Sequence, residues 1–350
     1  MNKKVKILFL QKTNKFSGAE NIVIMLMKLL SPRFEVYYVS PDGPIKKRVE
    51  SEGLNFVALP ALSLISIIKT IKKINPDIIH ATDYSMSATA SILGNKIPIV
   101  SHIHNDPTWI TEPWNLKTIV YALAIKRIKK IVAVSSSVEK EFFYKSKLKG
   151  KITVIPNVVD LRRVERLAYV TNQRNNYDLA FVGRLAYQKN PIFFCKLIKE
   201  LKKEKPNITA VMIGEGELEN KVKKYINDND LSKNIDMLGF VKNPYVILNC
   251  CKISVLPSRF EGFGLAAVEA MSLGKPVICG DVGGLVDVVT DETGKLCDTF
   301  EEYITEIQKL LQDKIYYQKK SYNAKIRAQK FGNLEGYRDK FIEIYKEMLK

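Results

Sequence analysis

Short runs of aliphatic and β-branched residues alternate along the chain with segments whose apolar residues recur at helical spacing. The expected strands are 5–10, 35–40, 77–80, 97–102, 131–134 and 153–155, followed by 178–182, 209–213, 235–238, 253–256 and 276–279. The expected helices are 20–30, 63–74, 116–130, 137–145, 192–204, 218–228 and 266–272. This alternation predicts an α/β protein whose parallel sheets carry helices on both faces.

The alternation pauses between Asn157 and Asn176, where an arginine-rich run leads into a polar segment. At 350 residues the chain is too long for one ordinary hydrophobic core. We therefore predict two similar doubly wound domains, 1–168 and 169–334.

The stretch from Ile304 to Lys350 has a helical pattern throughout. Gly332 and Gly336 are the expected breaks, because glycine weakens a helix interior.

The composition is that of a globular protein, with 46% hydrophobic and 26% charged residues. No apolar run approaches the ~20 residues that span a bilayer, so we expect no membrane-spanning segment. The first apolar run, Val5–Leu10, is expected to be a buried strand and not a signal peptide. The five cysteines lack C-x-x-C pairs and metal-ligand spacing, which favours reduced core residues and a cytoplasmic location.

The net charge of +18 is concentrated in the first half of the chain. Residues 1–165 carry 26 − 13 = +13 and residues 166–350 carry 29 − 24 = +5. Such an excess could meet an anionic membrane surface, a phosphorylated acceptor or nucleic acid, or could simply form solvated faces. No finger spacing, zipper or RNA-binding aromatic motif accompanies the lysines, so nucleic acid is not an expected partner. Peripheral attachment to the inner face of a membrane stays open.

The strongest chemical signal is a glycine-rich segment, Pro257–Met271, that follows an expected strand and opens a helix. Free backbone N–H groups at a helix start, reinforced by the helix dipole, form an anion site suited to phosphate. Glu269 follows Glu261 by eight positions, and a carboxylate beside phosphate is suited to sugar hydroxyls, most economically those of ribose. The segment Gly262–Ala267 also fits a G-x-G-x-x-A dinucleotide fingerprint, although that motif belongs after the first strand of a nucleotide domain.

The second signal is the loop Phe181–Pro191, which leaves the first strand of the second domain. Arg184 and Lys189 on this loop could neutralise a diphosphate together and so replace a divalent metal. The alternative is that both are solvated basic residues. Their place after a strand of an open α/β sheet favours ligand binding.

With these motifs the chain resembles the GT-B-fold retaining glycosyltransferases of family 4, also called group 1. The matching residues are Gly183-Arg184-Leu185 with Lys189, the pair Glu261 and Glu269 in E-G-F-G-L-x-x-x-E-A-M, and Gly274-Lys275-Pro276-Val277-Ile278. Supporting matches are Ile213-Gly214-Glu215-Gly216, Leu238-Gly239-Phe240-Val241, Pro156-Asn157-Val158-Val159-Asp160 and Gly283-Gly284. The matches run in order from about Gly18 to Gly294, which is most of the chain.

The resemblance implies two Rossmann-like domains facing across a cleft, with the C-terminal helix 335–350 returning to the first domain. It implies a retaining enzyme that moves a hexose or N-acetylhexosamine from a nucleotide-diphosphate sugar, expected to be a UDP-sugar. The acceptor would be a saccharide or lipid-linked saccharide of bacterial surface polysaccharide assembly. No cofactor and no metal are expected.

The resemblance also implies residue roles. Arg184 and Lys189 would hold the diphosphate and stabilise the leaving group, while Glu269 would bind ribose and Glu261 the transferred sugar. Val241 would lie beside the base. The implied donor-binding residues are Gly18, Gly183, Arg184, Lys189, Gly214, Val241, Glu261, Gly262, Phe263, Gly264, Leu265 and Glu269. The implied catalytic residues are His104, Arg184, Lys189 and Glu261.

In the first half, the strand that ends at Ser101-His102-Ile103-His104 holds two of the three histidines. Alternation places His102 and His104 on one face and Ile103 on the other. The resemblance favours His104 as the residue near the transferred sugar, whereas a histidine at a strand end can equally be structural. The pair has no third partner at metal-ligand spacing.

The segment Phe16–Glu20 is similar to the family's glycine loop after the first strand, with Gly18 allowing acceptor or phosphate to approach. Ser17 stands where the family has a second glycine, which leaves the acceptor contacts open. Ser17 and Glu20 also have the spacing of a capping box.

The triplet Asp228-Asn229-Asp230 imitates the D-x-D metal site of another glycosyltransferase fold. It follows a helical pattern instead of a strand, so we expect a loop that ends a helix and no Mn²⁺ dependence.

Two other functions fit parts of the pattern. A non-hydrolysing nucleotide-sugar epimerase has the same architecture, although the Glu261 and Glu269 pair argues against it. A basic nucleic-acid-binding module is the non-enzymatic alternative.

Overall fold

The computed structural model describes residues 4–93, 96–170 and 176–350. It divides into unit 1, Met1–Val158 with Leu334–Lys350, and unit 2, Val159–Asn333. The predicted junction at 168/169 falls inside unit 2, because helix α7 (Leu161–Ala168) packs on two other helices of that unit. The polar segment 171–175, which was expected to belong to the linker, lies outside the described residues.

The sheet of unit 1 has seven parallel strands. In spatial order they are β3 (Asn55–Leu59), β2 (Glu35–Pro41), β1 (Lys6–Leu10), β4 (Ile78–Thr82), β5 (Ile99–Ile103), β6 (Lys130–Ala133) and β7 (Ile152–Val154). The chain proceeds outward in one direction from β1 and in the other from β4. The carboxyl ends of β1 and β4 therefore form the switch point where ligands of such sheets bind.

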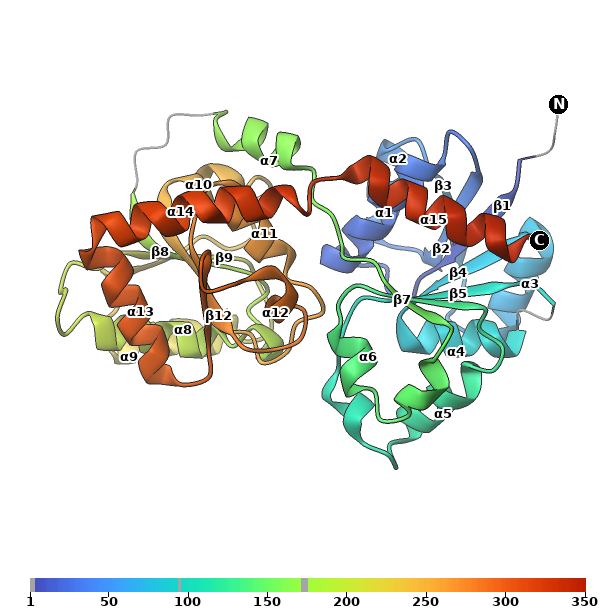
Figure 1. Cartoon of the computed structure of the whole chain (residues 1–350), viewed down its shortest axis with the longest axis horizontal. Coiled ribbons are helices and arrows are strands. Elements are labelled where there is room, and N and C mark those ends of the chain that lie inside the picture. Colours follow the sequence, from blue (N-terminus) through green and yellow to red (C-terminus); the bar gives the residue numbers. More distant parts are fainter. Residues whose placement is uncertain (1–3, 94–95, 171–175) are drawn as a thin grey trace. The chain divides into compact units, whose positions relative to one another are not determined.

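The helices of unit 1 cover both faces of this sheet (Figure 1). They are α1 (Gly18–Leu30), α2 (Pro44–Ser51), α3 (Leu64–Ile74), α4 (Asp83–Leu93), α5 (Leu116–Ala124), α6 (Ser137–Glu141) and α15 (Leu334–Met348), with 3₁₀ helices η1 (Thr108–Thr111) and η2 (Lys145–Leu148). The C-terminal helix α15 packs on α1, while α4 packs on α3 and α5. The main core of the unit lies under α3, α4 and α5.

Unit 2 has a six-stranded sheet that is also parallel. Its spatial order is β10 (Ile235–Met237), β9 (Ala210–Ile213), β8 (Tyr177–Val182), β11 (Cys251–Leu256), β12 (Val277–Gly280) and β13 (Gly294–Cys297). The switch point lies between β8 and β11. Both units thus confirm the predicted doubly wound α/β architecture.

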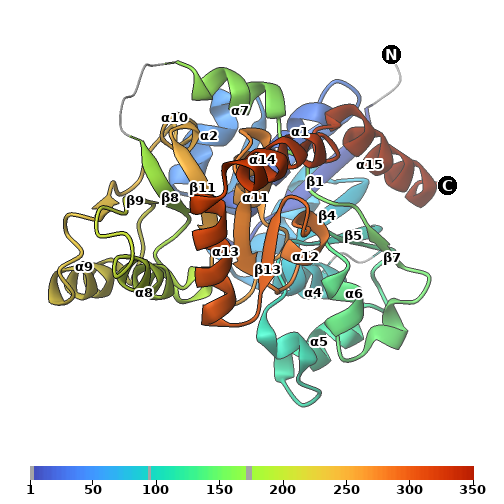
Figure 2. The same cartoon turned by 60° about the vertical axis from the view of Figure 1, so that its left-hand side comes forward.

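Two layers of helices enclose the sheet of unit 2 (Figures 1 and 2). One layer holds α8 (Pro191–Leu201), α9 (Glu219–Asp228) and α13 (Phe300–Gln312), and the other holds α7, α10 (Tyr245–Asn249), α11 (Leu265–Ser272) and α14 (Lys314–Gln329). The short helices η3 (Tyr187–Lys189) and α12 (Leu285–Val288) follow strand ends. The helices α8, α9 and α13 bury their apolar sides in one core cluster.

The sequence pattern missed several elements. Strand β3 is partly exposed and β13 is four residues long, so neither has a strong apolar run. Helix α4 buries small serine and alanine side chains that give little apolar periodicity, and α7 is rich in arginine and buries only Val164 and Ala168. The helix expected over 116–130 ends at Ala124, and Gly336 lies inside α15 instead of breaking it.

Candidate active site

The carboxyl ends of the unit 2 strands bring together most of the predicted site residues. They occupy the loops after β8 (Gly183, Arg184, Lys189), after β9 (Gly214), after β10 (Val241) and after β11 (Glu261, Gly262, Phe263, Gly264), with Leu265 and Glu269 on α11. Because all six strands are parallel, these loops lie at one edge of the sheet. The predicted Gly18 and His104 belong to unit 1 and are described below.

An ion pair between Lys189 and Glu261 joins the loops after β8 and β11, at the switch point. The side chains are 18% and 13% exposed, so both charges are partly removed from water. The Ser258 hydroxyl donates a second hydrogen bond to the Glu261 carboxylate at 3.2 Å. A charged ligand at this edge would meet a cation and a carboxylate that are already held in place.

Gln188 ties Arg184 to the same assembly. The Gln188 side-chain amide donates to the Phe260 carbonyl at 3.1 Å, and its carbonyl accepts from the Arg184 guanidinium at 3.3 Å. The Gln188 backbone carbonyl accepts from the Arg259 amide at 2.8 Å. Arg184 is exposed, so its guanidinium has donors left for a ligand.

Helix α11 begins with free backbone donors. Gly264 is its N-cap and has φ +94°, where a β-carbon would come within 2.6 Å of the Leu285 side chain. The part of the chain that the structure describes offers no hydrogen-bond acceptor to the amides of Phe263, Gly264 and Leu265. Three adjacent amides at a helix start form a site for an anion.

Glu269, on the first turns of α11, is held by Tyr245. The Tyr245 hydroxyl donates to the Glu269 carboxylate at 2.8 Å. Burial raises the pKa of Glu269 to about 7, although the Tyr245 hydrogen bond and the Arg163 cation both act to lower it. The carboxyl can therefore both accept and, when protonated, donate a hydrogen bond near neutral pH.

The loops after β9 and β10 pack directly against the loop after β8. Gly214 has φ +136°, and a β-carbon there would lie 2.1 Å from the Gly183 carbonyl oxygen. The Gly214 amide donates to the Gly239 carbonyl at 2.8 Å, and the Phe240 amide donates to the Glu215 carboxylate at 3.1 Å. Val241 follows Phe240 at this edge and is partly buried.

In unit 1 all three histidines form one buried row. His80 Nε2 lies 3.0 Å from His102 Nδ1, and the ring centroids of His102 and His104 are 4.0 Å apart. Ile103 packs into the core on the opposite side, which confirms the predicted alternation. The Tyr345 hydroxyl of α15 lies 2.6 Å from His80 Nδ1 and extends the row.

Burial lowers the pKa of His80 and of His104 to about 3, so both imidazoles stay neutral at physiological pH. Both ring nitrogens of His104 lack a hydrogen-bond partner among the described residues. The His104 amide donates to the Asp83 carboxylate at 2.9 Å, and Asp83 starts α4 after β4 with φ +59°. His104 thus ends the row at the carboxyl edge of unit 1, as a neutral imidazole whose two ring nitrogens make no hydrogen bond to the described residues.

The predicted capping box at Ser17 and Glu20 does not form. The Ser17 hydroxyl contacts the Glu20 carboxylate directly and makes no hydrogen bond to the backbone of α1. Glu20 is buried, and its carboxylate takes the place of a backbone amide as the partner of the Ser17 hydroxyl. Gly18 is the first residue of α1 and is exposed.

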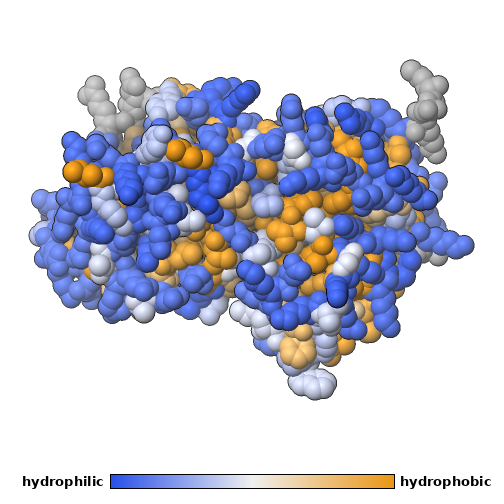
Figure 3. All heavy atoms as spheres, in the orientation of Figure 1, coloured by the Kyte–Doolittle hydropathy of each residue, from blue (hydrophilic) through white to orange (hydrophobic). Residues whose placement is uncertain are grey.

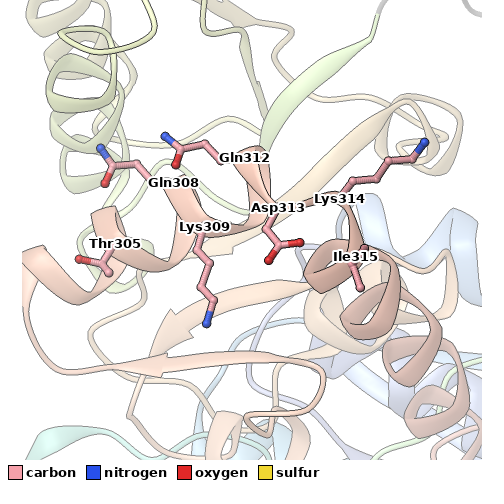
Figure 4. Close-up of a pocket in the computed structure, with 7 residues that line it drawn as sticks. All are labelled: Thr305, Gln308, Lys309, Gln312, Asp313, Lys314 and Ile315. Atoms are coloured by element: carbon pink, nitrogen blue, oxygen red, sulfur yellow. The ribbon is translucent and has the colours of Figure 1, made fainter.

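Features elsewhere in the described ranges do not compete with this edge. Asp228 ends α9 and Asn229 is its C-cap, as predicted. No cluster of three or more His, Cys, Asp or Glu side chains among the described residues could hold a metal ion. Figure 4 shows a surface depression at the junction of α13 and α14, lined by residues 305–315, that contains none of the predicted site residues.

The same ranges hold no helix that is long and apolar enough to cross a bilayer. All five cysteines are free.

Sequence reasoning missed the residues that support the site. Tyr245 and Arg163 act on Glu269 from separate helices, so no local spacing connects them to it. Gln188 and Ser258 lie within four residues of Arg184 and Glu261, but a glutamine and a serine in a loop carry no signal of their own. Asp83 was missed because its left-handed backbone has no sequence signal in an aspartate.

Comparison with known proteins identifies the family. A model described as Glycosyltransferase Family 4 matches residues 16–163, and one described as Glycosyl transferases group 1 matches residues 169–327. The chain belongs to the group 1 / family 4 glycosyltransferases. It is a glycosyltransferase that uses a nucleotide sugar, so neither the epimerase nor the nucleic-acid-binding alternative applies.

Two bacterial relatives align over nearly the whole chain. An Escherichia coli UDP-Gal:alpha-D-GlcNAc-diphosphoundecaprenol alpha-1,3-galactosyltransferase is 29% identical over 354 residues, 89% of this chain and 89% of that protein. A Campylobacter jejuni N-acetylgalactosamine-N,N'-diacetylbacillosaminyl-diphospho-undecaprenol 4-alpha-N-acetylgalactosaminyltransferase is 24% identical over 349 residues, 92% of this chain and 94% of that protein. Both names describe acceptors that are saccharides on a lipid diphosphate.

The fold is that of GT-B glycosyltransferases. The crystal structure of Anabaena HepE in complex with UDP and glucose superposes with a TM-score of 0.84 at 20% identity, covering 98% of this chain and 99% of that one.

Proposed function

We propose that the enzyme transfers a hexose or N-acetylhexosamine from a UDP-sugar to a lipid-diphosphate-linked saccharide, with retention of anomeric configuration and without a metal ion. The acceptor and pathway are suggested by the names of the two bacterial relatives, and surface polysaccharide assembly is the corresponding process. The five free cysteines fit a reducing compartment, so the reaction is assigned to the cytoplasmic face of the membrane.

The observation that carries the donor half of this proposal is the Lys189–Glu261 ion pair beside the open amides of α11. An incoming diphosphate would compete for Lys189, join Arg184 and bind the helix amides. Glu261 would then be released to accept hydrogen bonds from hydroxyls of the transferred sugar. One bound molecule would thus engage Arg184, Lys189 and Glu261 together.

In the proposed reaction the bond between the sugar C1 and the diphosphate oxygen breaks, and its electron pair leaves with the UDP. Arg184 and Lys189 stabilise the negative charge that develops there, which replaces the usual role of a divalent ion. The acceptor hydroxyl forms the new bond to C1 and gives its proton to a phosphate oxygen of the leaving group. Glu269 holds the ribose, with its carboxyl oriented by Tyr245.

The test is transfer in detergent solution from UDP-Gal, UDP-GalNAc, UDP-Glc and UDP-GlcNAc to synthetic undecaprenyl-diphosphate saccharides, in buffer with EDTA. We expect one donor to be used and an α-linked product by NMR. Arg184→Ala, Lys189→Ala and Glu269→Ala should each lower kcat/KM by about 10²–10³-fold. An inverted product, or wild-type transfer by all three variants, would reject the proposal.

Lys196→Ala is the matched control for Lys189→Ala. Lys196 is exposed on α8, so the substitution makes the same charge change away from the strand ends. It should leave both transfer and the UDP-induced rise in melting temperature unchanged.

A further inference from the structure

Helix α5 of unit 1 is apolar on both its inner and its outer side. Its inner side packs within unit 1. The Tyr121 hydroxyl lies 2.9 Å from that of Ser101, and the Thr118 hydroxyl donates to the Trp109 carbonyl at 2.6 Å. The outer side carries Leu116, Val120 and Leu123, which are 73%, 38% and 59% exposed. Positions 116, 120 and 123 recur at helical spacing, so they form one stripe.

Two exposed aromatic residues lie on neighbouring segments. Trp114, directly before α5, is 87% exposed, and Phe143, after α6, is 51% exposed. The Phe143 amide donates to the Ile110 carbonyl at 3.0 Å, and the Tyr144 hydroxyl donates to the Pro113 carbonyl at 2.9 Å. These bonds hold the segment after α6 beside the segment before α5.

Trp114, Leu116, Val120, Leu123 and Phe143 are here called the α5 face. Figure 3 shows hydrophobic atoms exposed at the end of unit 1 that α5 and α6 form in Figure 1. Isolated exposed apolar residues are ordinary, but several exposed apolar side chains, including Trp and Phe, on segments that hydrogen bonds hold together indicate a binding surface.

The segments that carry the α5 face also carry exposed cations. They are Lys117, Lys126, Arg127, Lys140, Lys145, Lys147 and Lys149. Within the described ranges none of these seven forms an ion pair, whereas Lys223 and Lys224 on α9 of unit 2 pair with Glu219 and Asp228. The same segments also carry the exposed carboxylates of Glu112, Glu139 and Glu141, and the cations outnumber them.

We propose that the α5 face docks on the surface of an anionic lipid bilayer. Apolar side chains with a Trp enter the boundary between headgroups and acyl chains, and lysines and arginines around them bind anionic headgroups. A second copy of this chain is a poorer occupant, because a two-fold contact through the same face would oppose one ring of cations to another.

The reason for docking follows from the proposed function, because a lipid-linked acceptor is presented at a bilayer. Strand β5, which carries His102 and ends next to His104, continues through residues 104–107 into η1 and Trp114. Within unit 1, the α5 face thus starts from the same strand end as His104. A bilayer held by this face would present acceptors beside the carboxyl edge of unit 1.

The first experiment is flotation of the purified full-length enzyme with vesicles of phosphatidylcholine alone or mixed with phosphatidylglycerol, at low and high salt. We expect binding to the mixed vesicles that weakens with salt. Leu116→Ser with Leu123→Ser should reduce the bound fraction about tenfold or more. Ile315→Ser with Ile326→Ser is the matched control on α14 of unit 2, where the residues are 80% and 51% exposed, and it should bind like wild type.

Tryptophan fluorescence gives a second measurement that does not depend on whether the leucine variants fold. The chain has two tryptophans, and Trp109→Phe leaves Trp114 as the sole indole. Its emission should shift to the blue on mixed vesicles and be quenched by lipids brominated on their acyl chains. Lys145→Glu with Lys147→Glu should weaken binding while leaving the melting temperature unchanged.

Three results would overturn the docking surface. They are equal binding by the Leu116/Leu123 and Ile315/Ile326 double variants, a Trp114 emission that vesicles do not alter, and a wild-type dimer that Leu116→Ser with Leu123→Ser converts to monomers. Transfer in detergent separates this proposal from the proposed function. Intact transfer without vesicle binding rejects the surface alone, and vesicle binding by an enzyme that fails every donor assay rejects the function alone.

Discussion

The two units share a topology and differ in what their carboxyl edges present. The edge of unit 2 combines backbone features, namely close-packed glycines and free helix amides, with the Lys189–Glu261 side-chain ion pair. The edge of unit 1 is built from buried side chains, and burial lowers the pKa of His104 to about 3 and raises the pKa of Asp106 to about 7. On the proposed function, one fold would therefore support an anion site in one unit and a nearly neutral polar site in the other, as expected where function depends on the loops and not on the sheet.

The largest effect is expected where the backbone of unit 2 cannot accept a side chain. Gly264 has φ +94°, and a β-carbon at this position would lie 2.6 Å from the Leu285 side chain. For Gly264→Val we therefore expect a loss of about 3 kcal/mol in the free energy of unfolding and no UDP-induced melting shift. Gly53→Ala in unit 1 is the control, because Gly53 has φ +72° with open space around it and should cost only about 1 kcal/mol. Urea unfolding measures both, and equal losses would contradict the comparison.

A second variant separates the two edges by function. His104→Ala should lower transfer by about 10–100-fold while leaving the UDP-induced melting shift intact, because His104 lies in unit 1. Glu261→Gln should lower transfer and also weaken UDP-sugar binding relative to UDP alone. The comparison fails if His104→Ala abolishes UDP binding.

The pH dependence of stability tests the buried carboxyl of unit 2. Since folding raises the pKa of Glu269 to about 7 from an ordinary 4.5, the folded chain binds this proton more tightly than the unfolded chain. The resulting stabilisation is fully present below pH 4.5 and is lost as the pH rises through 7. Glu269→Gln should therefore gain about 2 kcal/mol relative to wild type between pH 5 and pH 8. Urea titrations at the two pH values measure this gain, and a pH-independent difference would contradict the assignment.

The smallest effect is expected from Tyr245→Phe, which removes the hydroxyl that holds Glu269. The free energy of unfolding should fall by about 1 kcal/mol, and the donor KM should rise several-fold with little change in kcat. Tyr345→Phe is the counterpart in unit 1, where the lost hydroxyl contacts His80. It should cost similar stability and leave the donor KM unchanged.

Much of the fold could be predicted from local patterns. The β-branched runs located eleven of the thirteen strands in the described ranges, because buried parallel strands are continuously apolar. The partly exposed β3 and the short β13 lacked that signal, and α7 was mistaken for a linker because its arginines hide a narrow buried side. The site motifs could be predicted because glycine and charge stand at strand ends, while partners such as Tyr245 come from a separate helix.

By itself, the sequence determined the alternation that makes two parallel sheets, the glycine-rich helix start and the excess of positive charge in the first half. Only the tertiary structure decided that Lys189 meets Glu261 across 72 residues, that three histidines form one row, and that the outer side of α5 stays apolar and exposed. The reason is physical: periodicity and turn preference act within a few residues, whereas ion pairing and desolvation depend on which distant segments the sheet order brings together.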